Sequence, residues 1–243
     1  MLWQLLLLAL AVQLLLFVPA YLLRTDKLTD FSYALTFILL ALLAAKAAPT
    51  HVVLVAMIVL WALRLGTFLV IRITATGKDK RFDGVREHAL RFLGFWLLQG
   101  LTVWIVMLPS LMFFESGERA WMLGSLVWLV GVIIETAADA QKLRFRQQHT
   151  GRWIETGLWK YSRHPNYFGE ILCWVGIYVF VFPGLSVIQR VFGALGPVFI
   201  AVLLIFFSGV PPLEKYADKR WGHDPKYQKY KQETSTLVPW PRR

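Results

Sequence analysis

Four charged residues recur at helical spacing where the fifth apolar run of the chain ends. Glu135, Asp139, Lys142 and Arg146 follow one another at intervals of four, three and four residues, so they lie along one side of a helix. A ladder of salt bridges on a solvated face accounts for the two bases, but it does not account for an acid as deep in the apolar run as Glu135. Because carboxylates bind hydroxyl groups and arginine binds phosphate, the pattern is compatible with a bound dinucleotide.

The densest polar and aromatic motif follows at residues 157–170, which read GLWKYSRHPNYFGE. Its proline suits the first turn of a helix, where the missing N–H costs nothing. Asn166 and Glu170 are four residues apart and therefore share one face of that helix. Arg163, His164 and the free N–H groups of the helix start predict an anion site. We expect no metal site, because His164 has only Glu170 as a further ligand at suitable spacing.

Arg64 is the clearest ionisable residue inside an apolar run. A charge in the bilayer is costly, and it usually faces the interior of the helix bundle or a wet cavity. Arg72 follows eight residues later and points to a similar side, about 80° further round the helix. Snorkelling to the membrane surface explains Arg72 at the end of the run, but it does not explain Arg64. We therefore expect a functional or pairing role for Arg64.

The C-terminal tail contains a basic and aromatic segment. Tyr227 and Tyr230 are three residues apart, so they align on a helix with lysines interleaved. One interpretation is an amphipathic helix that lies on anionic lipid. The other is that the tail folds back on the bundle and takes part in a site, since it is too long to be a simple terminus.

The composition indicates that membrane helices position these residues. Of the 243 residues 57% are hydrophobic, with 17 Phe and 11 Trp, which is more than a soluble domain of this length needs. A membrane span needs about 20 mostly apolar residues. Seven runs qualify or come close: 1–23, 31–48, 52–73, 92–114, 120–138, 168–184 and 191–210. No linker divides the chain, so we expect a single membrane domain over residues 1–243.

The bases alternate between the two sides of these seven runs. By the positive-inside rule this places the N-terminus outside and the long loops and the tail in the cytoplasm. The net charge of +11 suits a cytoplasmic membrane surface rather than a nucleic-acid interface, because the bases lie between apolar runs. We expect an all-α, multi-pass protein of the inner (plasma) membrane. The segments 24–30, 72–91, 139–167 and 211–243 hold 22 of the 26 Lys and Arg residues, and the other gaps hold only Lys46, Arg119 and Arg190.

The chain lacks the glycine-rich dinucleotide loop, the Walker loop and the Gly-x-Ser-x-Gly motif. These absences exclude a soluble Rossmann or P-loop domain. Any cofactor must therefore be bound by helix ends, loops and the tail.

Residues 135–170 and the tail resemble the steroid 5-alpha-reductase superfamily, particularly its bacterial branch. The resemblance rests on the stripe from Asp139 to Arg146, the block SRHPNYFGE at 162–170 and the closing segment from Tyr230 to Pro239. The third run and its loop also look like that branch, through Arg64-Leu-Gly-Thr-Phe, Arg72 and Asp79-Lys-Arg81. The first 50 residues resemble it only weakly.

The resemblance implies an NADPH-dependent oxidoreductase that reduces a conjugated carbon–carbon double bond in a steroid-like or other lipid. Cytoplasmic loops and the tail would close the cofactor site, with substrate-side helices in 1–114 and the cofactor-binding half in 115–243. Hydride would pass to the β-carbon while a donor stabilises the developing enolate oxygen. Together with the motifs above, it predicts a cofactor site formed by Arg64, Arg72, Arg81, Asp139, Lys142, Arg146, Tyr161, Arg163, His164, Asn166, Tyr167, Glu170, Arg220, Tyr227 and Tyr230.

The sequence departs from the steroid reductases at the substrate carbonyl. Those enzymes place a glutamate and a tyrosine from early spans on that group. Here the second run has no glutamate, and Trp61 stands where the tyrosine aligns. Asp30 and Tyr33, at the start of the second run, are the candidates for the acid and the hydroxyl, and Trp61 is a candidate substrate contact.

Three alternatives remain open. The Arg-His-Pro-x-Tyr-x-Gly core, followed by a glutamate and a Tyr-x-x-Tyr tail, also resembles isoprenylcysteine and phospholipid methyltransferases, which use S-adenosylmethionine. A non-catalytic lipid-binding protein on the same fold is the second alternative. A transporter would place polar residues at mid-depth along several runs, whereas here they gather toward the inside face.

Overall fold

The computed structural model describes residues 1–46, 51–76, 84–117 and 119–242, and most of these residues are helical. A 3₁₀ helix (Gly157–Lys160) precedes α6, and a π-helical turn (Leu203–Phe207) joins α8 to α9. Within these ranges there is no β-strand, which confirms the predicted all-α class. The helices are α1 (Leu2–Leu22), α2 (Lys27–Ala45), α3 (Val52–Thr76), α4 (Ala89–Ser116), α5 (Met122–Gln148), α6 (Pro165–Val181), α7 (Val187–Gly193), α8 (Leu195–Val202), α9 (Val210–Trp221) and α10 (Pro225–Glu233).

Seven helical stretches in the described part of the chain are long and apolar enough to cross a membrane, as predicted. The fifth extends to Gln148, beyond the predicted end at residue 138, because the charged stripe continues the same helix. The seventh, Val187–Trp221, consists of α7, α8, the π-helical turn and α9. The protein is therefore a multi-pass membrane protein.

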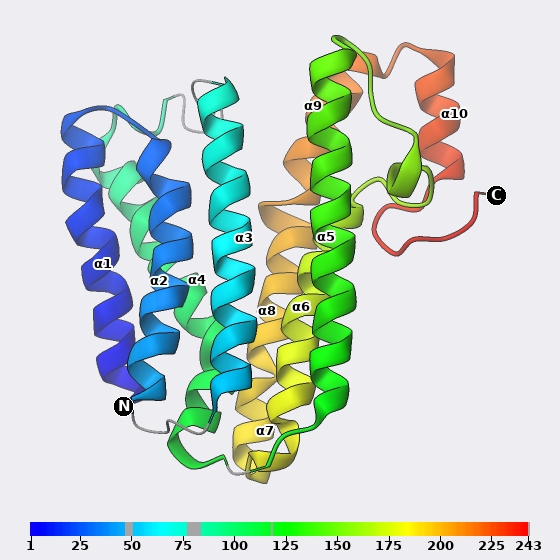
Figure 1. Cartoon of the computed structure of the whole chain (residues 1–243). Helices are drawn as coiled ribbons and strands as arrows, with labels where there is room; N and C mark the ends of the chain where they lie inside the picture. The colour runs from blue at the N-terminus through cyan, green and yellow to red at the C-terminus, as the bar shows by residue number, and fades with distance from the viewer. Residues whose placement is uncertain (47–50, 77–83, 118, 243) are drawn as a thin grey trace. The chain divides into compact units, whose positions relative to one another are not determined.

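The chain divides into two compact units. Unit 1 comprises Met1–Trp121 and Ile177–Gly196, and unit 2 comprises Met122–Gly176 and Pro197–Arg243. In unit 1, α2 packs against α1, α3 and α4, and α1 also packs against α4 (Figure 1). The largest side chains buried in this unit are Phe37, Trp61, Phe92, Trp96, Phe113 and Phe114.

A network of polar side chains lies inside unit 1. Gln13 of α1 is fully buried, and its Nε2 donates to the Thr36 hydroxyl at 2.8 Å. Gln99 of α4 donates through its Nε2 to Oε1 of Gln13 at 2.9 Å and to the Ser32 hydroxyl at 2.8 Å. Hydrogen bonds between membrane helices contribute about 0.6–2 kcal/mol each. These bonds therefore stabilise the packing of α1, α2 and α4.

In unit 2, α5 and α6 approach each other closely through glycines. A Cβ atom on Gly131 of α5 would lie 2.7 Å from the Cys173 nitrogen. One on Gly169 of α6 would lie 2.6 Å from the Glu135 nitrogen. For the residues that face each other, the residue number increases along α5 while it decreases along α6. The two helices are therefore antiparallel at this interface. The backbones touch because no side chain separates them, as is usual for small residues between membrane helices.

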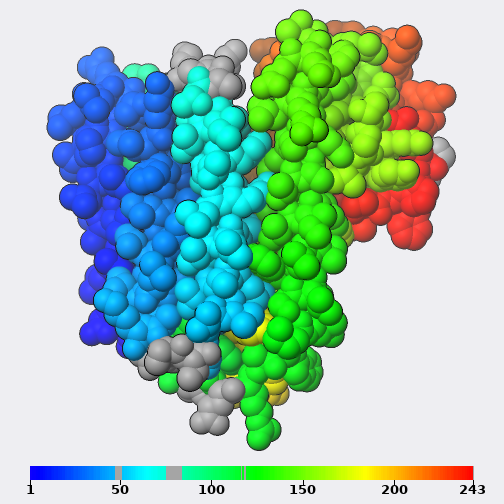
Figure 2. Space-filling model, viewed as in Figure 1, coloured from blue at the N-terminus to red at the C-terminus, as the bar shows by residue number. Residues whose placement is uncertain are grey.

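The surface of the spans is apolar where it faces away from each unit's core. In the space-filling view, α5 is the green column and α3 is the cyan one (Figure 2). Their exposed side chains include Leu60, Leu63, Val70 and Ile71 on α3, and Leu126, Leu129, Val130 and Ile133 on α5. A soluble protein rarely exposes so many large apolar side chains along one helix, so these surfaces contact membrane lipid.

Replacing Gly176 by alanine is expected to lower the free energy of unfolding in detergent by about 1–3 kcal/mol, the usual cost of overpacking. The added Cβ would overlap the backbone nitrogen of Trp128, which cannot move without displacing α5. Gly94→Ala is the matched control, since a Cβ on this α4 glycine meets nothing within 4 Å. Thermal unfolding of both variants is the measurement, and equal midpoints would show that α5 and α6 are not closely packed.

Candidate functional site

Arg163 clamps the tail of unit 2 to the segment that precedes α6. Its Nε and Nη2 donate to the two carboxylate oxygens of Glu214 at 3.1 and 3.2 Å. Its Nη1 donates to the backbone oxygens of Lys231 and Thr234 at 2.7 and 2.6 Å, and so caps the end of α10. Nη2 also donates to the Thr236 hydroxyl at 2.9 Å. All three guanidinium nitrogens are engaged, and the predicted contact of Arg163 with an anion stays a prediction.

His164 is buried next to this clamp. Its Nε2 lies 2.9 Å from Oε1 of Glu214, and its ring stacks on Tyr167 with centroids 5.6 Å apart. Its Nδ1 is buried and has no hydrogen-bond partner among the residues that the structure describes. Burial lowers the pKa of His164, an effect that the hydrogen bond to Glu214 opposes and the positive charge of Lys142 reinforces. A neutral imidazole with its proton on Nε2 leaves Nδ1 as a buried acceptor.

The two tail tyrosines belong to the same arrangement. The Tyr230 hydroxyl donates to the backbone oxygen of Trp159 at 2.9 Å, and the Tyr227 hydroxyl donates to Oδ1 of Asp218 at 3.3 Å. The Tyr227 ring packs edge-on against Trp153, with centroids 5.3 Å apart. Burial raises the pKa of both tyrosines, so both hydroxyls stay protonated at neutral pH. The tail therefore folds back on the rest of unit 2, as one of the two interpretations predicted. Its part in a site stays a prediction.

The last described residues run alongside the segment before α6. Ser162 and Ser235 form an isolated parallel bridge, and the Arg163 amide donates to the Ser235 oxygen at 2.8 Å. The Ser162 hydroxyl donates to the Leu237 oxygen at 2.7 Å. Further along, the Trp240 amide donates to the Tyr161 oxygen at 3.0 Å. The tail thus covers the turn that leads into α6.

Two acids of α5 are buried near its interface with α6. Glu135 and Asp139 are both buried, and Glu135 packs against Gly169. Asp139 lies one helical turn further on, which by the same antiparallel register is level with the start of α6. At this level Asn166 is half-buried, and its Oδ1 is buried without a hydrogen-bond partner in the part of the chain that the structure describes. Buried acceptors and carboxylates therefore gather where α5 and α6 meet.

A tight turn places a cation beside these acceptors. Lys142 of α5 has its Nζ 4.4 Å from the ring centre of Trp159, which is itself buried. The Trp159 indole donates to the Ala138 oxygen at 3.0 Å. Gly157 permits the turn, because its φ is +61° and a Cβ would lie 2.5 Å from Oε1 of Gln141. The turn before α6 is thus packed against α5.

Other predicted residues of unit 2 are half-buried or exposed. Glu170 is half-buried on α6, and Arg146 is exposed near the end of α5. Tyr161 is 41% exposed, with Lys160 Nζ 5.8 Å from its ring centre. Arg220 is exposed and donates to the Tyr216 hydroxyl at 2.8 Å. Among the described residues, no hydrogen bond joins Arg220 to Arg163 or Glu214.

The remaining predicted residues belong to unit 1. Asp30 pairs with Arg72 at 3.0 Å, and the Tyr33 ring packs edge-on against Phe37, which packs in the same way against Trp61. Arg64 is half-buried, with its guanidinium carbon 5.8 Å from the ring centre of Phe68. Arg81 lies outside the described residues. The predicted substrate contacts and the predicted cofactor contacts of α5, α6 and the tail therefore fall in different units.

Glu214 is a functional candidate that no sequence motif indicated. It receives hydrogen bonds from Arg163, lies next to His164 and is 3.4 Å from the Lys231 ammonium. Its signal in the sequence is an acid that directly follows the seventh apolar run. Among the described residues, no group of three or more His, Cys, Asp or Glu side chains could bind a metal ion.

Unit 2 is expected to lose stability as the pH falls below about 6.5, the ordinary pKa of histidine. The pKa of His164 is lowered in the fold, so the unfolded chain takes up a proton first and acid favours unfolding. The stability contributed by neutral His164 is complete above that pH and is lost as the pH falls toward the folded pKa. Thermal unfolding between pH 8 and pH 5.5 measures this, and His164→Gln should flatten the dependence. The exposed His223 provides the control substitution, His223→Gln. An unchanged slope in His164→Gln would contradict the expectation.

The apolar helices define a multi-pass membrane protein with a folded polar tail. The chain belongs to the DUF1295 family, described as a protein of unknown function, whose model matches residues 16–234. No curated protein and no solved structure matches the chain. The matched segment contains every predicted site residue, from Asp30 to Tyr230, so the candidate site is part of the family region.

Proposed function

We propose that the chain is an NADPH-dependent reductase of a conjugated double bond in a steroid-like or other lipid, acting in the inner membrane with its cofactor site on the cytoplasmic side. The observation that carries the proposal is the set of buried acceptors where α5 meets α6. The Oδ1 of Asn166 and the Nδ1 of His164 lack partners among the described residues, and Asp139 is buried at the same level. A ligand rich in hydroxyl donors would complete these hydrogen bonds, and the ribose groups of a dinucleotide are such donors.

The contacts of each residue suggest its role in the proposed site. Asp139, Asn166 and Glu170 would accept hydrogen bonds from the cofactor, while Lys142 and Arg146 would offer positive charge to its phosphates. Arg163 and Glu214 would act by positioning the tail, because their polar atoms bind each other and the tail. The cofactor would supply hydride, and the protein would orient it and exclude water.

The substrate contacts are proposed in unit 1. Tyr33, Phe37 and Trp61 form one cluster of edge-on aromatic rings. Tyr33 is half-buried, whereas Phe37 and Trp61 are fully buried, so Tyr33 is the ring of this cluster that could contact a lipid. Asp30 is paired with Arg72 and would act as an acid only after that pair opens. Tyr33 is therefore the better candidate for donating a hydrogen bond to the substrate carbonyl.

One observation favours the methyltransferase as a second candidate. Because Arg163 is engaged by Glu214 and by tail carbonyls, fewer arginines remain for the phosphates of a dinucleotide. The buried carboxylates would instead suit the ammonium group and ribose of S-adenosylmethionine. A non-catalytic lipid-binding role is the third candidate, and it predicts binding without turnover.

An assay of catalytic turnover distinguishes the three candidate functions. The detergent-purified protein is mixed with NADPH and a panel of enone lipids, and oxidation of NADPH is followed by its absorbance. The reductase predicts enone-dependent oxidation that needs an about 10- to 100-fold higher NADPH concentration in Asn166→Ala. Methyl transfer from labelled S-adenosylmethionine to lipid, without NADPH oxidation, would replace the reductase by the methyltransferase.

A further inference from the structure

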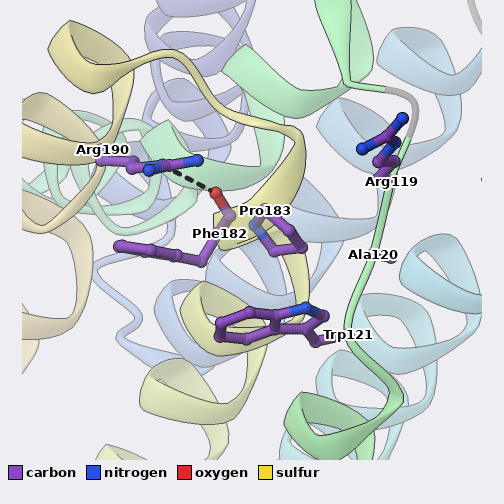
Figure 3. A pocket seen from close by; sticks show the side chains of 6 residues that line it. All are labelled: Arg119, Ala120, Trp121, Phe182, Pro183 and Arg190. Atoms are coloured by element: carbon purple, nitrogen blue, oxygen red, sulfur yellow. Dashed lines mark hydrogen bonds between the residues drawn. The ribbon is translucent and has the colours of Figure 1, made fainter.

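A pocket of about 530 Å³ lies in unit 1, beside the segment that follows α4 and the turn that follows α6 (Figure 3). It is lined by Arg119, Ala120, Trp121, Phe182, Pro183 and Arg190. The lining contains two arginines and no acid, and it shares no residue with the proposed cofactor site. Its chemistry therefore requires a separate explanation.

Arg190 is held in a fixed orientation at one side of the pocket. Its Nε donates to the Phe182 oxygen at 3.1 Å, and its guanidinium carbon lies 4.5 Å from the centre of the Phe182 ring. Its own backbone oxygen accepts a hydrogen bond from the Tyr178 hydroxyl at 2.9 Å. Its two Nη groups have no hydrogen-bond partner within the ranges that the structure describes, so four N–H donors remain for a ligand.

Arg119 lies across the pocket, on the other side of Pro183 (Figure 3). A Cβ atom on Gly184 would lie 2.6 Å from the Arg119 backbone oxygen, so the two chain segments pack backbone against backbone. The Trp121 amide donates to the Phe180 oxygen at 2.9 Å. These contacts fix the positions from which the two arginine side chains extend. The side chain of Arg119 is exposed, and it forms no ion pair with a carboxylate in the described residues.

The pocket lies at the level of the membrane surface. The neighbouring apolar stretches end at Glu115 and Gly184, and the next one begins at Val187. The Trp121 ring stacks on Phe182, with centroids 6.1 Å apart, and tryptophan is enriched at membrane interfaces. The adjoining side of α7 is apolar and exposed to lipid, with exposed fractions of 67–73% at Val187, Ile188 and Val191.

We propose that this pocket binds an anionic phospholipid, with its phosphate between Arg119 and Arg190 and an acyl chain along the exposed side of α7. The planar guanidinium of arginine binds phosphate oxygens through paired hydrogen bonds. The distribution of charge supports the proposal, since these two arginines are two of the three bases on the side of the membrane that the sequence predicts to be outside. Bases are depleted on that side. Two that line one aromatic pocket indicate a specific anion.

Native mass spectrometry of the detergent-purified full chain, titrated with phosphatidylglycerol, tests the proposal. One molecule of phosphatidylglycerol should bind to the wild-type protein more tightly than to the arginine variants. Arg119→Gln and Arg190→Gln should each raise its dissociation constant about tenfold, the loss of a charge-assisted contact. The double variant should retain no tightly bound lipid. Phosphatidylcholine and soluble glycerol phosphate, titrated in parallel, should bind more weakly than phosphatidylglycerol.

The control is Arg24→Gln with Arg91→Gln, which removes the same charge from two exposed arginines of unit 1 outside the pocket. This variant should bind phosphatidylglycerol like the wild type, and thermal unfolding should show that all variants remain folded. Equal binding by the pocket and control double variants would overturn the proposal. Arginine-dependent binding of glycerol phosphate without binding of the lipid would also overturn it, in favour of a soluble phosphate ligand.

Discussion

Replacing Glu214 by glutamine is expected to lower the free energy of unfolding of unit 2 by about 1–3 kcal/mol, the cost of leaving a largely desolvated charged group without its partner. Glu214 is 17% exposed and Arg163 is 12% exposed, so little water can replace the lost carboxylate. The guanidinium would keep its bonds to the tail carbonyls but would lose its counter-ion. The His164 imidazole would lose the charged acceptor of its Nε2 proton at the same time.

Thermal unfolding in detergent measures this loss, and limited proteolysis should show cleavage of the tail in Glu214→Gln at a protease concentration that spares the wild type. Glu233→Gln is the matched control, because Glu233 forms an exposed pair with Lys229 at 3.8 Å. Exposed pairs contribute about 0–1 kcal/mol. A loss below about 1 kcal/mol in Glu214→Gln would show that the clamp does not stabilise unit 2.

The second large effect is expected on cofactor binding. Asn166→Ala should raise the dissociation constant for NADPH about 10- to 100-fold, since a hydrogen bond to a buried group contributes about 1–3 kcal/mol and each 1.4 kcal/mol is tenfold. The stability of the apo protein should change little or rise, because the variant removes a buried oxygen that lacks a partner among the described residues. Weaker NADPH binding without a loss of stability distinguishes a ligand contact from a packing residue.

Isothermal titration of NADPH into the two purified proteins measures the change. Gln228→Ala provides the control, as it removes an exposed amide from α10 that is hydrogen-bonded only to the Gly222 oxygen among the described residues. Unaltered NADPH affinity in Asn166→Ala would remove this side chain from the proposed site.

Hydropathy and charge were enough to predict the spans, because each span is a local run of apolar residues. The stripe from Glu135 to Arg146 was predicted on one helix for the same reason, and α5 confirms it. The start of α6 at Pro165 also followed from local chemistry, since proline is favoured in the first turn.

The contacts that join distant segments could not be predicted in this way. Arg163 is 51 residues from Glu214, and Gln99 is 86 residues from Gln13. No spacing rule links such pairs, because their proximity depends on how whole helices and the tail pack. The sequence predicted that Arg163 binds an anion, but it gave no sign that the donors of Arg163 also hold the tail. The buried Gln13 and Gln99 network gave no signal beyond polar residues in apolar runs.

The most direct test of NADPH binding is a thermal-shift titration of the wild-type protein with NADPH, NADH and S-adenosylmethionine, repeated on Asn166→Ala and Gln228→Ala. A cofactor site that includes Asn166 predicts stabilisation by NADPH in the wild type and in Gln228→Ala, and in Asn166→Ala stabilisation only at an about 10- to 100-fold higher NADPH concentration. Stabilisation by S-adenosylmethionine alone, or by none of the three ligands in a folded protein, would contradict it.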